Sequence, residues 1–171
     1  MKRTTSIFLI AVLLITFVCT GCDQQDKIRE PIYFYYRTDN IEYGTDSGVI
    51  TMEIRDGFGH MDDYVYLTNM YLGGPVTKGC YSPFPAGTTL IRLDLVKDTV
   101  LVILSSHISL LSGAELSIAC TCLARTLLEM TDMKAVQIVA DGDLLDGKES
   151  ITIRIDDFVT NDSDHLTPAT G

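Results

Sequence analysis

The chain has 171 residues, of which 13 are Lys or Arg and 23 are Asp or Glu, and its formal net charge is −10. A surface this acidic argues against nucleic acid or anionic lipid as the main partner. The length is sufficient for one domain with a proper hydrophobic core.

The first 21 residues have the pattern of a secretory signal peptide. Basic residues at positions 2 and 3 precede an apolar run over 7–19, which is too short to span a bilayer because spanning needs roughly 20 residues. Thr-Gly-Cys at 20–22 resembles a bacterial lipobox, although Cys19 stands where leucine is usual. The thiol of Cys22 would then receive a diacylglycerol, with cleavage just before it. The alternative is a chance cysteine after an ordinary signal peptide.

A lipobox at this position predicts how the chain is organised. Residues 1–21 are the lipoprotein signal peptide, and their removal takes away two basic and no acidic residues, which makes the net charge −12. Residues 22–30 are a charged tether, held by a lipid on Cys22 at the outer face of the cytoplasmic membrane. Residues 31–159 form the domain, and 160–171, which contain no aromatic residue, form a flexible tail.

Most of the predicted strands are recognised by alternation. The aromatic run PIYFYY at 31–36 reads as a strand. In VITMEIRD, Ile50, Met52 and Ile54 fall on one side, and Glu53 and Arg55 on the other. Alternation of this kind predicts a sheet with one buried and one solvated face.

The later strands are predicted in pairs. TLIRLDLV alternates apolar residues at 91, 93 and 95 with Arg92 and Asp94, and KDT turns the chain into the apolar strand VLVILS. AVQIVA and SITIRID form a final pair, joined by the Gly- and Asp-rich DGDLLDGKE at 141–149.

Two segments have helical spacing instead. Residues 61–72 place side chains at i, i+3, i+4 and i+7, and Gly-Gly-Pro at 73–75 ends the helix. In the second, Ser112 is the predicted N-cap of a capping box with Glu115, and apolar residues at 116, 119, 120, 123, 127 and 130 form one face. The order of elements predicts an α+β fold: a single mixed or antiparallel sheet with two helices packed on one face.

Several of these segments together resemble the GerM-type sporulation and spore germination domain. They are YLGGP, SPFPAGTTL, the strand VLVILS followed by SGAELSIACTCLARTLLEM, and MKAVQIVADG, within roughly residues 31–148. The resemblance implies a lipoprotein or secreted protein of spore-forming bacteria with no known enzymatic activity. It also implies similarity to ring-building domains of secretion and sporulation channels, with Gly74-Pro75, Pro85 and Gly87 shaping turns. This chain has room for a single copy of a domain that often occurs in tandem.

Motifs typical of enzymes occur, but each lacks a part. Asp-Ser-Gly at 46–48 has no second such loop as in aspartic peptidases, so a turn is expected. Ser105, Ser106 and His107 follow a strand, but neighbours in sequence seldom face one another as a nucleophile and base must. We predict no catalytic residues.

Cofactor motifs are equally incomplete. Cys120 and Cys122 point to different faces of a helix, so we expect two buried, unlinked thiols, while Cys80 pairing with one of them stays open. The segment 141–149 has Leu145 where a calcium loop needs an oxygen ligand, so a hairpin loop is expected. No metal or other cofactor is predicted.

The remaining hypothesis is a binding surface. The solvated sheet face would carry Glu53, Arg55, Arg92, Asp94, Thr152 and Arg154, and the loop over 76–88 presents Tyr81 and Phe84. We expect a lipid-anchored module for an envelope protein partner or for self-association, with no nucleic acid and no small-molecule substrate. The alternative is a small secreted cell-wall hydrolase or an accessory factor to one.

Overall fold

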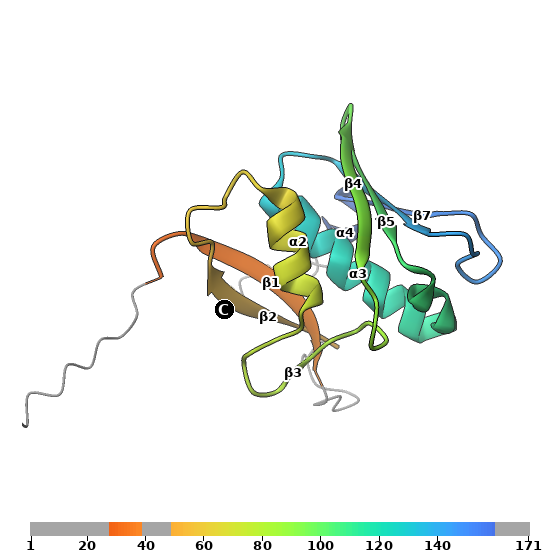
Figure 1. Cartoon of the computed structure of the whole chain (residues 1–171), viewed down its shortest axis with the longest axis horizontal. Coiled ribbons are helices and arrows are strands. Elements are labelled where there is room, and N and C mark those ends of the chain that lie inside the picture. Colours follow the sequence, from red (N-terminus) through yellow and green to blue (C-terminus); the bar gives the residue numbers. More distant parts are fainter. Residues whose placement is uncertain (1–27, 39–48, 160–171) are drawn as a thin grey trace, which may run out of the picture.

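The computed structural model describes residues 28–38 and 49–159, with nothing stated for the side chain of Val159 (Figure 1). The predicted signal peptide, Cys22, most of the tether, the tail and the Asp-Ser-Gly segment therefore lie outside the described residues. Within them, no helix is long and apolar enough to cross a membrane.

The elements in chain order are β1 (Pro31–Thr38), β2 (Ile50–Asp56), α2 (Tyr64–Leu72), β3 (Cys80–Tyr81), β4 (Leu90–Val96), β5 (Thr99–Leu104), the 3-10 helix η1 (Ser106–Leu110), α3 (Gly113–Met130), β6 (Ala135–Ala140), β7 (Ile151–Arg154) and α4 (Asp156–Val159).

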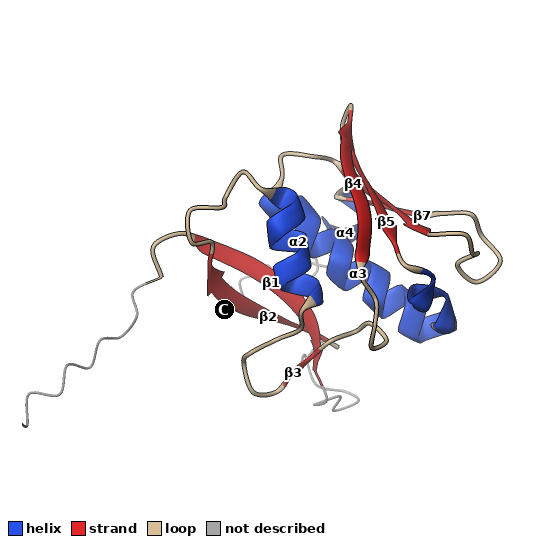
Figure 2. Cartoon of the chain, viewed as in Figure 1, coloured by secondary structure: helices blue, strands red, loops and turns tan. Residues whose placement is uncertain are grey.

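The α+β class is confirmed, but the strands form two sheets where one was predicted. The first is antiparallel with strand order β2-β1-β3, and the second has the order β4-β5-β6-β7. In the second sheet β5 and β6 run parallel, because α3 connects them, and both outer pairs are antiparallel. Helices α2 and α3 lie between the two sheets, where α3 contacts β1, β6 and β7, and α2 contacts β4 (Figure 2).

Helix α3 also takes the place of a missing strand beside β1. The backbone N–H of Tyr35 donates to the hydroxyl of Thr126 on α3, at 2.9 Å, instead of to another strand. The hydroxyl of Tyr71 on α2 donates to the carbonyl of Tyr35, also at 2.9 Å. Beside its short pairing with β3 at Arg37 and Thr38, β1 is therefore bonded along this edge by side chains of the helices, and no strand of the second sheet pairs with it there.

The core lies around α3 and the inner face of β1. Ile32, Phe34 and Tyr36 point inward from β1, and Tyr36 stacks on Tyr71 with ring centroids 4.9 Å apart. The predicted apolar face of α3 is confirmed, because its residues at 116, 119, 120, 123 and 127 are all buried and Met130 packs against them. Ser112 is the N-cap as predicted, but its side chain makes no capping hydrogen bond.

The first helix and the final hairpin differ from the predictions only in detail. Helix α2 begins at Tyr64, three residues later than expected, because Asp63 caps it by accepting a hydrogen bond from Tyr66 N–H at 2.9 Å. It ends at Leu72 with Gly73 as the C-cap, as the sequence indicated. Strands β6 and β7 form the expected antiparallel pair, and β4 and β5 are joined through Lys97, whose φ is 58°.

Candidate binding surfaces

The prediction for the two faces of β2 is wrong, and this changes the candidate surface. Glu53 is 2% exposed, whereas Met52 and Ile54, which were expected in the core, are 45% and 44% exposed. Alternation separates the two sets of side chains but does not say which set faces inward. Here the polar set is inside, so Glu53 and Arg55 are not part of a solvated face.

The buried Glu53 and the half-buried Arg55 hold the loop that follows α2. The carboxylate of Glu53 accepts hydrogen bonds from Val76 N–H at 2.9 Å and Thr77 N–H at 2.6 Å, and it forms an ion pair with Arg55. Burial alone would raise the pKa of Glu53, but the hydrogen bonds from Thr77 and Arg55 outweigh it and lower the pKa. The pair therefore fixes this loop to the first sheet and presents little surface to a partner, since the Arg55 side chain is 13% exposed and that of Glu53 is buried.

The outer face of the first sheet carries apolar side chains, and those of β2 are left exposed by the described residues. By register, Ile54 lies opposite Tyr33, and Met52 lies opposite Tyr35. Both tyrosines are half-buried, whereas Met52 and Ile54 are exposed. These four residues are called the open sheet face. Among the described strands β2 is at the edge of its sheet, so apolar side chains and a strand edge occur together.

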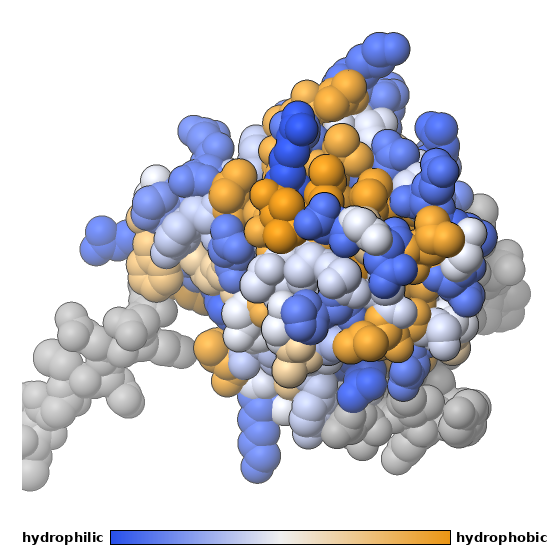
Figure 3. Space-filling model, turned by 45° about the vertical axis from the view of Figure 1, so that its right-hand side comes forward, coloured by the Kyte–Doolittle hydropathy of each residue, from blue (hydrophilic) through white to orange (hydrophobic). Residues whose placement is uncertain are grey.

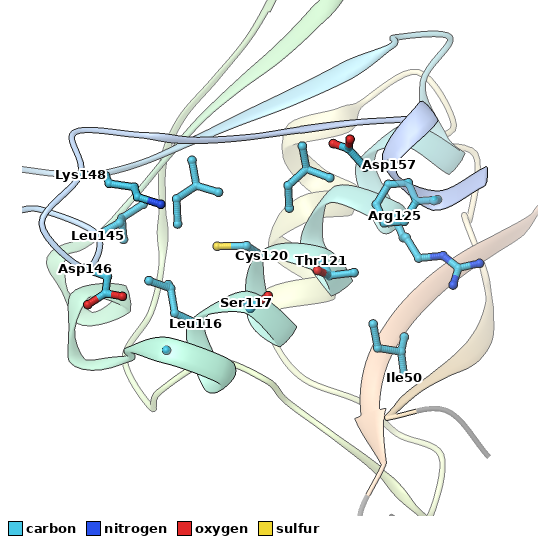
Figure 4. Close-up of a pocket in the computed structure, with 14 residues that line it drawn as sticks. Ile50, Leu116, Ser117, Cys120, Thr121, Arg125, Leu145, Asp146, Lys148 and Asp157 are labelled. Carbon is cyan, nitrogen blue, oxygen red and sulfur yellow. The ribbon is translucent and has the colours of Figure 1, made fainter. Parts of the chain in front are cut away.

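A cavity of about 580 Å³ lies next to this face, between α3, the β6–β7 hairpin and α4 (Figure 4). Leu116 and Cys120 of α3 and Leu145 of the hairpin form much of its apolar lining. Figure 4 shows the sulfur of Cys120 pointing into the space between α3 and the hairpin, with Asp146 and Lys148 at one end. The lining is mixed, because apolar side chains stand beside the charged Arg125, Asp146, Lys148 and Asp157. The cavity therefore suits a side chain or a small molecule that has both apolar and polar groups.

Arg125 joins the cavity to the open sheet face. Its guanidinium lies 4.5 Å from the ring centroid of Tyr35 and 5.7 Å from that of Phe158. Arg125 also lines the cavity, together with Ile50 of β2. A partner on the open sheet face would therefore meet a cation held over an aromatic ring, next to a cavity.

The predicted charged residues of the later strands do share a face. Arg92 pairs with Asp94 on β4, and the register of the second sheet puts Thr152 and Arg154 of β7 on the same side. Between them lie the half-buried Leu101, Ile103 and Val139. Figure 3 is turned toward this side of the molecule and shows hydrophobic residues gathered among hydrophilic ones. This outer face is a second candidate surface, and it is separate from the open sheet face.

Tyr81 and Phe84, the two aromatic residues of the predicted binding loop, have different surroundings. Tyr81 lies on β3 at the edge of the first sheet and is 42% exposed. Phe84 packs against the core, with its ring centroid 5.9 Å from that of Tyr71. Phe84 therefore holds the loop in place and is not a contact for a partner.

Ser105 and His107 are closer than sequence reasoning expected. Ser105 Oγ lies 3.3 Å from His107 Nδ1, but it also accepts a hydrogen bond from Thr89 N–H at 3.0 Å and lies 3.4 Å from the carbonyl of Gly87. In the described part of the chain no carboxylate bonds to His107, so nothing there orients it as a general base. The pair instead joins the 87–89 turn to the end of β5.

The predicted burial of the helix cysteines is confirmed. Cys120 and Cys122 are at most 1% exposed, and burial raises the pKa of each thiol to about 12. Cys80 is a half-buried free thiol, so it bridges neither of them. Across residues 28–38 and 49–159, no three His, Cys, Asp or Glu side chains come together as metal ligands would.

Comparison with known proteins identifies a family. The family model for sporulation and spore germination, named Germane, matches residues 31–146. Among solved structures, the tandem GerMN domains of the sporulation protein GerM from Bacillus subtilis are 21% identical, with a TM-score of 0.51 over 70% of this chain and 43% of that one. A protein from Clostridium perfringens assigned as a lipoprotein is 18% identical, with a TM-score of 0.46 over 75% of this chain and 90% of that one. A search of curated proteins finds no match.

Proposed function

Because this chain belongs to the sporulation and spore germination family and carries a GerM-type domain, we propose that it is a non-catalytic, lipid-anchored binding module of the cell envelope. The observation that carries the proposal is the inversion of β2, which buries an ion pair and exposes Met52 and Ile54. Exposed apolar side chains grouped on a sheet face are typical of an interaction surface.

The partner we propose is an envelope protein that docks on the open sheet face. The face offers Tyr33 and Tyr35 as flat, half-buried rings, with the cation of Arg125 above Tyr35. Aromatic residues and arginine are the side chains that most often dominate binding energy in protein interfaces. The unpaired outer edge of β2, at least among the described strands, also suits the addition of a strand from the partner.

Anchoring at Cys22 supports this function physically. A lipid anchor and a short tether confine the domain to the membrane surface, which raises its effective concentration toward a partner in the same membrane. Replacing Cys22 with Ser should release the mature protein from the membrane fraction and abolish incorporation of labelled fatty acid. Cell fractionation measures both. Unchanged membrane retention in the variant would show that the anchor lies elsewhere.

The binding surface is tested by placing a charge on the open sheet face. Ile54→Lys should weaken partner binding by about tenfold or more, because a cation replaces an apolar contact at the centre of the interface. A photo-crosslinking residue at position 54 identifies the partner in sporulating or germinating cells, and titration with that partner gives the Kd.

The matched control is Ile91→Lys on β4, where Ile91 is 53% exposed and outside the open sheet face. It should leave the Kd unchanged, as should replacing Ser105 and His107 together with Ala. If Ile91→Lys weakens binding and Ile54→Lys does not, the second sheet is the interface. Loss of function in the folded Ala variant alone would favour a hydrolase.

A further inference from the structure

An exposed phenylalanine stands out in the loop between β2 and α2. Phe58 is 71% exposed, whereas Phe34 is buried, and Phe84 and Phe158 pack against the core. Its φ is 52°, a left-handed conformation that is uncommon for a bulky residue, and glycines flank it on both sides. Strained residues of this kind persist only where the surrounding structure holds them, and they cluster at functional sites.

The surrounding hydrogen bonds hold this loop firmly against the start of the domain. Asp56 accepts from the backbone N–H groups of Arg29 and Phe58, both at 2.9 Å. Glu30 accepts from Gly57 N–H through its carbonyl, at 2.9 Å, and from Gly59 N–H through its carboxylate, at 2.6 Å. The outward position of Phe58 is therefore fixed by four contacts, and the loop sits beside the first residues of β1 (Figure 1).

Further exposed apolar and aromatic side chains lie on the Phe58 loop and on the two segments that bond or stack against it. With Phe58 at 71%, they are Ile28 at 41%, Met61 at 41% and Tyr66 at 39% exposure, and together these residues are called the loop patch. Tyr66 is held by His60, with ring centroids 4.0 Å apart. Single exposed apolar residues are ordinary, but a group of them at one end of a domain indicates a contact. An aromatic ring with a polar tip suits the boundary between water and lipid.

The position of the patch indicates what it contacts. Ile28 is part of the patch and follows Cys22 by six residues, so the chain between them reaches about 20 Å at most. A lipid on Cys22 therefore keeps the loop patch close to the bilayer surface. We propose that the loop patch inserts into the headgroup region beside the anchor and so fixes the orientation of the domain; this rests on the lipid anchor proposed above.

The charges near the patch define the kind of membrane. Glu30 and Asp56 carry carboxylates that bond to loop amides, and Asp63 caps α2. Acidic groups beside the patch disfavour anionic lipid, so the contact depends on burial of apolar side chains in a zwitterionic interface. Salt should therefore have little effect on it.

The chain contains no tryptophan, so one introduced tryptophan is a specific probe. The full acylated protein carrying Phe58→Trp is reconstituted in phosphatidylcholine vesicles, with and without brominated acyl chains. The emission of the introduced indole should move to shorter wavelength, and the brominated lipid should quench part of it, because the headgroup region adjoins the upper acyl chain. The matched control is Leu110→Trp in η1, because Leu110 is 75% exposed but lies outside the patch. The emission of this control should stay at the wavelength of a water-exposed ring and remain unquenched.

Met61→Trp is a second fluorescent probe of the loop patch. It replaces Phe58→Trp in the test of membrane insertion if circular dichroism shows that Phe58→Trp is unfolded. Vesicle flotation and mass measurement come first; a chain without acyl groups overturns the anchor and this proposal with it. Floating protein with both patch probes unquenched, or quenched no more than Leu110→Trp, overturns the membrane contact while the anchor stands. A shift to shorter wavelength without quenching means that protein covers the patch, which also overturns it.

Discussion

Arg55→Leu is expected to lower the free energy of unfolding by about 3–5 kcal/mol, as measured by urea denaturation. The side chain of Arg55 is 13% exposed, and it donates to the carboxylate of Glu53, to the hydroxyl of Tyr36 at 3.2 Å and to the carbonyl of Met70 at 3.4 Å. It also lies 5.2 Å over the ring of Phe34. Its removal leaves the carboxylate of Glu53 buried without a counter-charge, and this accounts for most of the expected loss.

Two controls separate the buried charge from the lost packing. Changing Glu53 and Arg55 together to Leu should cost less than Arg55→Leu alone, because no uncompensated charge remains. Arg92→Leu, which removes an exposed pairing with Asp94, should change the stability by no more than about 1 kcal/mol. Equal losses for Arg55→Leu and Arg92→Leu would show that the buried pair has no special role.

The same carboxylate predicts a response to acid. The pKa of Glu53 is lower in the folded protein than its ordinary value of 4.5, so Glu53 contributes stability at neutral pH. That contribution begins to fall as the pH drops below about 4.5 and is lost as the pH passes through the folded pKa. In Glu53→Gln this part of the pH dependence should vanish, which denaturation at several acidic pH values would reveal.

The inversion of β2 marks the limit of reading a strand from its alternation. The alternation located β2 and separated the side chains of its two faces correctly. It wrongly predicted that the face with the apolar side chains is the buried one. The outcome goes with the loop after α2, whose N–H groups at Val76 and Thr77 donate to the carboxylate of Glu53. Those contacts arise only from tertiary packing. The open sheet face was therefore not predicted, although Met52 and Ile54 are exposed on it because the same strand turns Glu53 inward.

Elements with several local signals were predicted well. Helix α3 has a preferred N-cap residue at Ser112 and a continuous apolar face, and both are observed. Arg92, Asp94 and Arg154 share a face, as alternation indicated. The division into two sheets was not predictable in this way, because it depends on Thr126 bonding to the edge of β1, 91 residues away in sequence. Local patterns contain no information about such a contact.

In the hairpin loop at 141–149 the turn was predicted from the sequence, but the burial of Leu145 was not. The expected turn is present, since Asp146 and Gly147 have positive φ values of 50° and 78° between Leu145 and Lys148, which bond to each other. This small turn directs Leu145 inward, where it is completely buried in a loop that otherwise reads as polar. The Asp-Gly pair was a signal for the turn, but not for the burial of its neighbour.

Leu145→Ala is therefore expected to lower the free energy of unfolding by about 2–5 kcal/mol, because the missing side chain leaves a void next to the existing cavity. The adjacent Leu144 is a close control, since it has the same side chain in the same loop but is 49% exposed. Leu144→Ala should change the stability by no more than about 0.5 kcal/mol. Urea denaturation of the two variants under identical conditions gives the comparison. If they lose the same stability, the hairpin does not close this side of the core, and the cavity is open to a partner without any rearrangement of the loop.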